Sequence, residues 1–257
     1  MLRREFLAAG AAGFFFPDIN QSAKPPILVP ERAIEGEVKN QLGRFGFARQ
    51  QLPEGRILEL PVSNVKRIAW TVDDGSSAEG IKDYLDFMQE HDLHMTFFIT
   101  SEYPGWISNR AQVQELVDAG NLQLANHTHF HPSLKSSSNS QIVEELTRCE
   151  KFIQDTFGVQ AKPYFRPPYG HIDARVESVA RELGYASPIM WSGTLGDSAR
   201  QRRNSIVQLG DKHIRDGAIL LDHFNARTPK PIFDELFKRL EQRKLRTVTL
   251  DDVYLHQ

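Results

Sequence analysis

From about Lys66 to the C-terminus, short apolar runs alternate with longer amphipathic stretches, and this alternation limits the folds open to the chain. Repeated strand–helix units place their strands in parallel and cover them with helices. The apolar runs therefore predict strands, and the stretches between them predict helices. The expected strands are residues 67–72, 95–100, 122–126, 163–166, 186–191, 218–222 and 247–250, and the expected helices are residues 78–90, 111–119, 140–157, 174–183, 198–215 and 232–243.

Seven strands alternating with six helices favour an α/β fold of the distorted (β/α)7-8 barrel type over an open doubly wound sheet. Parallel strands need right-handed crossovers, which bring the carboxyl ends of the strands to one face. Functional residues are therefore expected just after the strands. The only cysteine, Cys149, shares a helical stripe with Ile142, Leu146 and Ile153, so we interpret it as a core residue.

The first 65 residues do not follow this alternation. Arg3 and Arg4 precede a short apolar stretch, and residues 1–23 resemble a twin-arginine export signal, which would place the protein in the periplasm or cell envelope of a bacterium. A packed amphipathic helix is the alternative. Residues 24–65 carry scattered prolines and predict an N-terminal extension, which leaves residues 66–257 as the main domain.

Composition excludes several classes of protein. The chain has 31 Lys and Arg against 33 Asp and Glu, a net charge of -2, so a highly basic nucleic-acid binder is not expected. The apolar run at residues 6–16 is shorter than the roughly 20 residues of a membrane-spanning helix, so no integral membrane segment is expected. With one cysteine, a metal site would have to use histidine and carboxylate ligands.

Polar residues collect just past the expected strands. After the first strand, T-V-D-D-G supplies the adjacent carboxylates Asp73 and Asp74, although Asp-Asp-Gly alone is more often a turn. After the third strand, H-T-H-F-H places His127 and His131 four residues apart, so one helical turn would present both imidazoles to a divalent ion. Surface histidines are the alternative. His129 falls off that face and is interpreted as a spacer.

Three further motifs follow later strands. R-P-P-Y-G holds Arg166 beside two prolines, which suits either a guanidinium that orients a carboxylate or a structural turn. W-S-G-T-L-G-D ends at Asp197, and L-D-H ends an apolar strand at His223, either a core-edge group or a catalytic acid or base. Carboxylates, histidines and an arginine at one face of one barrel predict a metal-dependent hydrolase.

Taken in order, T-V-D-D-G, H-T-H-F-H, R-P-P-Y, W-x5-D and L-D-H resemble the five motifs of the polysaccharide deacetylases, the NodB-homology or carbohydrate esterase family 4 enzymes. The resemblance implies a distorted barrel as the catalytic domain over residues 66–257. It implies a divalent metal, most commonly Zn²⁺, and the removal of acetyl groups from an N-acetylated or O-acetylated polysaccharide or oligosaccharide. It further implies that Asp74, His127 and His131 hold the metal.

The resemblance assigns the remaining roles as well. Asp73 would be the general base and Arg166 would orient it, while the backbone N–H of Tyr169 would help bind the oxyanion. His223 would be the general acid, and Asp197 would tune it. The fourth motif departs from the family pattern where Thr194 replaces an Asp and Ser198 replaces a Trp, which bears on substrate choice more than on catalysis.

Two other functions fit the same barrel. One is a metal-dependent amidohydrolase acting on a small non-sugar amide, and the other is a non-catalytic carbohydrate-binding barrel. The loop Ser101–Asn109 carries Tyr103 and Trp106, which would either stack on a sugar or pack in the core.

Overall fold

The computed structural model describes residues 44–198 and 202–255. Eight strands form one parallel sheet, and two short strands form a second. The first sheet contains β2 (Arg67–Asp74), β3 (Met95–Ile99), β4 (Leu122–Asn126), β5 (Tyr164–Phe165), β6 (Ser187–Pro188), β7 (Gly193–Thr194), β8 (Ile219–His223) and β9 (Arg246–Thr247), and the second contains β1 (Gln50–Gln51) and β10 (Tyr254–Leu255).

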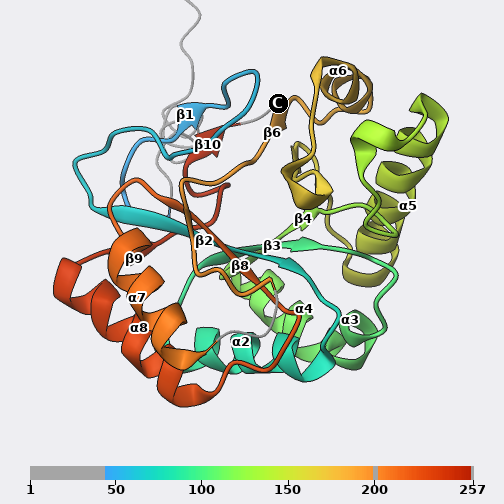
Figure 1. Ribbon diagram of the computed structural model, residues 1–257. Helices are drawn as coiled ribbons and strands as arrows, with labels where there is room; N and C mark the ends of the chain where they lie inside the picture. The colour runs from blue at the N-terminus through green and yellow to red at the C-terminus, as the bar shows by residue number, and fades with distance from the viewer. Residues whose placement is uncertain (1–43, 199–201, 256–257) are drawn as a thin grey trace, which may run out of the picture.

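The strand order of the large sheet is β6-β5-β4-β3-β2-β8-β7, and β9 pairs with the start of β2. Within the described residues β6 and β7 do not pair with each other, so the sheet curls into an open half-barrel. Helices surround it (Figure 1). This confirms the predicted α/β barrel. The helices are α2 (Ala78–His91), α3 (Gly105–Ser108), α4 (Arg110–Ala119), α5 (Asn139–Phe157), α6 (Ala174–Glu182), α7 (Arg203–His213) and α8 (Lys230–Arg243), with 3-10 turns η1 (Leu134–Ser136) and η2 (Pro168–Gly170).

The alternation of side chains along the strands divides the core into two layers. Trp70 and Leu220 point outward and pack under the helices, whereas Ala69 and Ile219 point inward and fill the barrel. Cys149 on α5 is fully buried, as predicted, and burial raises the pKa of its thiol to about 12. None of the helices in the described part of the chain has the length and apolar character of a membrane span.

The N-terminal segment bridges the open side of the half-barrel. Ile57 N–H donates to Pro188 O at 2.9 Å and Ile57 O accepts from Met190 N–H at 2.7 Å, beside β6. Leu60 N–H donates to Gly217 O at 2.8 Å, next to the start of β8. The described part of the predicted extension therefore packs on the barrel, while the predicted export signal at residues 1–23 lies outside the described residues.

Three predicted elements miss an observed bound by three residues or more, and one of them is the strand predicted at residues 247–250, which ends at Thr247 in β9. The strand predicted at residues 186–191 is observed as Ser187–Pro188, with Ile189 N–H still donating to Phe165 O at 2.9 Å, and Gly193–Thr194 forms the separate strand β7. The helix predicted from residue 198 begins at Arg203. Ser198 lies outside it because the preceding residue, Asp197, is held by hydrogen bonds to His223, which fix that stretch as a loop.

The aromatic layer between the sheet and α2 should dominate stability. Phe97 is fully buried, and its ring lies 4.6 Å from that of Phe224 and 6.5 Å from that of Tyr84. Replacing Phe97 with Ala should lower the free energy of unfolding by about 3–5 kcal/mol, measured by chemical denaturation. Val143→Ala on α5, where the side chain is exposed, is the matched control and should change it by less than about 0.5 kcal/mol. Equal losses in both variants would contradict this account of the core.

Candidate active site

A pocket of about 510 Å³ opens at the carboxyl ends of the barrel strands. Its walls come from segments at the ends of β2, β4, β5, β7 and β8, far apart in sequence. Because parallel strands all end at this face, residues from five motifs meet around one cavity. The predicted site residues in its lining are Asp73, Asp74, His127, His131, Tyr169 and His223.

The end of β2 turns two adjacent carboxylates into the same pocket. In a regular strand, neighbouring side chains point to opposite faces. Asp74 has a φ of 78°, which breaks the alternation, so it joins Asp73 in the pocket lining. Gly75 follows with a φ of 119° and lies so close to the Trp106 ring that a Cβ would come within 2.6 Å of it. Only glycine fits this turn.

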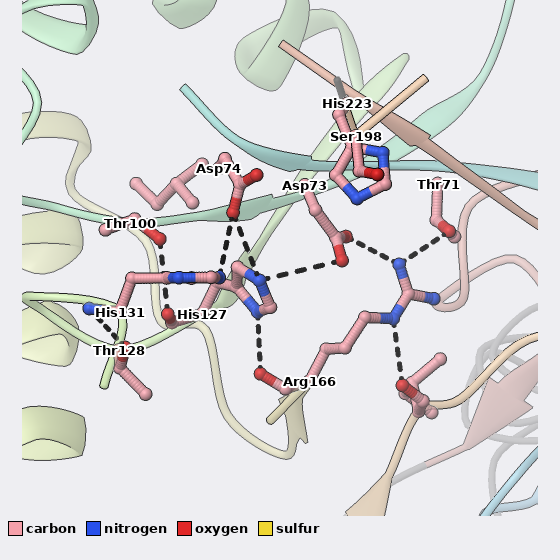
Figure 2. A network of polar contacts seen from close by, with 12 residues as sticks. Thr71, Asp73, Asp74, Thr100, His127, Thr128, His131, Arg166, Ser198 and His223 are labelled. Carbon is pink, nitrogen blue, oxygen red and sulfur yellow. Dashed lines mark hydrogen bonds and ion pairs between the residues drawn. The ribbon is translucent and has the colours of Figure 1, made fainter. Parts of the chain in front are cut away.

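Asp73 is held by a buried arginine. Arg166 Nη1 donates to Asp73 Oδ1 at 2.6 Å and to Thr71 Oγ1 at 2.8 Å. Its other nitrogens donate to the backbone carbonyls of Ile189 and Met190, at 2.9 and 3.0 Å. Burial lowers the pKa of Arg166, and the Asp73 carboxylate opposes that effect. The guanidinium therefore fixes one oxygen of Asp73 and leaves the other facing His127 (Figure 2).

The two predicted histidine ligands do meet, but not through a helical turn. Residues 127–131 form a loop in which Thr128 and His131 have φ values of 72° and 59°. His131 N–H donates to Thr128 Oγ1 at 3.1 Å, and the two imidazole rings lie 4.9 Å apart. His127 Nδ1 lies 2.7 Å from Arg166 O, to which it can only donate, so its Nε2 is unprotonated in the neutral ring.

Asp74, His127 and His131 fit a metal ion. Asp74 Oδ1 lies 3.4 Å from His127 Nε2 and 3.1 Å from His131 Nε2, and the three ligand atoms fall within 4.8 Å of one another. Asp74 Oδ1 is buried, and no group in the described part of the chain donates a hydrogen bond to it. Burial would raise the pKa of Asp74, but the facing imidazoles lower it well below its usual value. Two nitrogens and one carboxylate oxygen match a zinc-type set that leaves coordination positions open.

Two residues that the sequence motifs missed support these three candidate ligands. Asn225 Nδ2 donates to Asp74 Oδ2 at 2.7 Å, which leaves Oδ1 to face the imidazoles. Glu145 on α5 accepts the backbone N–H groups of His129 and Phe130 at 2.9 and 2.7 Å, and so fixes the histidine loop. An acidic residue on the apolar stripe of a predicted helix is a signal for Glu145. The sequence carries no comparable signal for Asn225.

On the other side of the pocket, His223 is oriented by Asp197. His223 Nδ1 lies 2.9 Å from Asp197 Oδ1, and the backbone N–H of His223 donates to Asp197 Oδ2 at 3.0 Å. With Nδ1 engaged, Nε2 is the ring nitrogen left to act in the pocket. Tyr169, with a φ of 60°, packs its ring edge-on against His131 at 4.6 Å.

The side chains of His129, Trp106 and Tyr103 contact neighbouring residues and do not line the pocket. His129 turns away from the ligand pair, and its Nδ1 lies 2.8 Å from Ser101 Oγ. Trp106 is fully buried and donates from Nε1 to Thr100 O at 3.1 Å, so it cannot stack on a sugar. Tyr103 is partly buried against the same core. The exposed ring in the pocket lining is that of Tyr169.

The site combines two carboxylates, two histidines and an arginine at the carboxyl face of an open parallel half-barrel. This combination is typical of metal-dependent hydrolases. The family model for polysaccharide deacetylase matches residues 62–188. These residues belong to the polysaccharide deacetylase family. A peptidoglycan-N-acetylglucosamine deacetylase, PgdA of Listeria monocytogenes, is 27% identical over 237 residues, which cover 89% of this chain and 48% of that protein. The chain thus spans about half the length of this relative.

Solved structures share the fold. The family 4 carbohydrate esterase PdaA of Bacillus subtilis superposes with a TM-score of 0.67 at 22% identity, covering 86% of this chain and 88% of that one. A carbohydrate esterase family 4 pseudoenzyme of Bacillus anthracis superposes with a TM-score of 0.66 at 23% identity, covering 79% and 72%. Since an esterase and a pseudoenzyme share this fold, the residues in the pocket must decide what the chain can do.

The candidate metal site can be tested with a control in the same loop. Stripped protein should bind one Zn²⁺ per chain in a calorimetric titration, and His131→Ala should abolish that binding. His129→Ala should leave it unchanged, because His129 faces Ser101. Zinc at about 100 times its dissociation constant should stabilise the wild type by about 2.7 kcal/mol. Equal weakening by both alanine substitutions would contradict the ligand set.

Proposed function

We propose that this protein is a metal-dependent deacetylase that removes acetyl groups from an N-acetylated glycan of the cell envelope. The observation that carries the proposal is the position of Asp73. One of its oxygens is fixed by Arg166 at 2.6 Å, and the other lies 3.6 Å from the Nε2 of a metal-ligand histidine, His127. Asp73 therefore lies beside the proposed metal site and is not itself one of the proposed ligands.

Each side chain then has a chemical task. The metal, when bound by Asp74, His127 and His131, would supply a Lewis acid that polarises the acetyl carbonyl. Asp73 accepts the proton of the attacking water, since Arg166 occupies only one of its oxygens. The pairing with Arg166 keeps the carboxylate oriented through the reaction.

The leaving group is protonated by His223, on the opposite wall of the pocket. Asp197 holds His223 by Nδ1, and Nε2 delivers a proton to the departing sugar nitrogen. The backbone N–H of Tyr169 is the proposed second donor to the oxyanion, the interaction that usually contributes most to such reactions. Hydrolysis of an amide needs this protonation because a sugar amide anion is too basic to leave.

The substrate assignment draws on the relatives. The Listeria relative is named for peptidoglycan N-acetylglucosamine, and a Bradyrhizobium relative, 28% identical over 162 residues, is named a chitooligosaccharide deacetylase. We therefore place the substrate among glycans that contain N-acetylglucosamine. A small non-sugar amide and an O-acetyl ester are alternatives that a substrate panel separates. A non-catalytic carbohydrate-binding barrel is disfavoured because the proposed ligands, base and acid are all present.

Turnover should require both the metal and Asp73. Zinc-loaded protein should release acetate from N-acetylglucosamine oligomers or peptidoglycan, and should lose that activity with chelator and regain it with zinc. Asp73→Asn should lower the turnover number by about 100-fold or more while retaining zinc binding by calorimetry. Asp252→Asn, a buried carboxylate paired with His94 outside the pocket, is the control and should keep wild-type turnover. No acetate from any glycan would exclude the substrate class, and an active Asp73→Asn enzyme would exclude the base.

We also propose that residues 1–23 direct export. Arg3 and Arg4 precede an apolar stretch, and the Listeria relative is named for peptidoglycan, a glycan of the cell envelope. Replacing both arginines with lysine should retain the protein in the cytoplasm, measured by fractionation of a bacterium expressing the full chain. Asp18→Asn in the same segment should not alter export. Unchanged export of the Lys–Lys variant would contradict a twin-arginine signal.

A further inference from the structure

Directly before the proposed general acid lies a carboxyl group that the proposed mechanism leaves unused. Asp222 follows three apolar residues of β8 and is 1% exposed. By strand alternation it points to the helix-covered face of the sheet, away from the pocket that Leu221 and His223 line. A carboxyl in that position is costly to ionise, because burial removes water from the charge.

The partners of Asp222 are donors on one side and a second carboxylate on the other. Trp70 Nε1 on β2 donates to Asp222 Oδ2 at 3.2 Å, and the Tyr84 hydroxyl on α2 donates to the same oxygen. On the other side, the backbone N–H of His223 lies 3.2 Å from Asp222 Oδ1 and 3.0 Å from Asp197 Oδ2. The two carboxyl groups thus converge on one N–H and contact each other.

We propose that Asp222 is a positioning residue that keeps a proton and donates it in a hydrogen bond to Asp197. The proton stays on Asp222, and Asp197 remains the carboxylate. The result is a buried chain, Asp222 to Asp197 to His223, in which a single negative charge faces the imidazole. Asp197 is then held from both ends, so His223 keeps the orientation that aims Nε2 into the pocket.

The surroundings favour this assignment of the proton. The groups facing Asp222 are Trp70 from β2, Tyr84 from α2, Asp197 from the loop after β7, and its neighbour His223. Burial raises the pKa of Asp222 well above its usual value, and the charge of Asp197 adds to the rise. Two carboxylates in contact cannot both stay ionised with one imidazole beside them.

The position of the proton can be measured without turnover. In carbon-13 NMR of the zinc-free full-length protein with labelled aspartate, one carboxyl should keep the chemical shift of a protonated acid throughout the neutral pH range. That signal should be absent from Asp222→Asn, whereas Asp252→Asn should leave it in place. If no carboxyl has that shift, the proposal is overturned, whatever the protein's activity.

The positioning role rests on the proposed deacetylase function and is tested on the zinc-loaded enzyme. Asp222→Asn retains a neutral donor to Asp197, so the basic limb of its pH–rate profile should coincide with that of the wild type. Asp222→Leu removes the donor, and its turnover number should fall by about ten- to a hundredfold. If Asp222 were ionised, both variants would remove a charge beside His223 and move the limb to lower pH together. That result, or equal turnover in both variants, would overturn the role. Because Asp222→Asn keeps an acceptor for Trp70 and Tyr84 and a donor to Asp197, its limb remains a test even if the leucine variant does not fold.

Discussion

The rest of the site depends on the buried ion pair between the Arg166 guanidinium and the Asp73 carboxylate. The guanidinium joins Asp73 and Thr71 on β2 to the carbonyls of Ile189 and Met190 beyond β6. The backbone of the same residue accepts from the His127 ring, so one residue orients both the proposed base and a proposed ligand. Removing the guanidinium would leave a buried carboxylate uncompensated, a loss of about 3–5 kcal/mol. Stability and function are therefore coupled at this position.

Backbone conformation is the second constraint. Six non-glycine residues of the described chain have positive φ, and four of them, Asp74, Thr128, His131 and Tyr169, lie in the site. The other two end helices α2 and α8, where such values are common. A left-handed conformation costs a non-glycine residue about 1–3 kcal/mol, so the surrounding hydrogen bonds must hold it in place. In the histidine loop, Glu145 and Thr128 supply those bonds.

The sequence was sufficient to predict the central strands, which follow from the local pattern of apolar residues, and the main site residues, which follow from the order of the motifs. Apolar runs located β2, β3, β4 and β8, and the rule that parallel strands end at one face brought Asp73 and His223 together in advance. The paths of loops were not predictable, because they depend on partners distant in sequence. His127 and His131 share a side through left-handed residues and the carboxylate of Glu145, which no spacing encodes. Asn225 was missed for the same reason, since it lies in the loop after β8 and its role depends on contact with Asp74 at the end of β2.

Charge balance around the pocket explains why its carboxyl groups behave differently. Asp73 has the Arg166 guanidinium, Asp74 faces two imidazoles that together suit a divalent cation, and Asp197 faces His223. Each of these three carboxylates thus faces a guanidinium or an imidazole. Among the described residues, the donors to Asp222 Oδ2 are the neutral groups of Trp70 and Tyr84, and the nearest imidazole is already engaged by Asp197. A buried carboxyl in that situation lowers its free energy by keeping its proton, and as a neutral donor it stabilises the charge on Asp197.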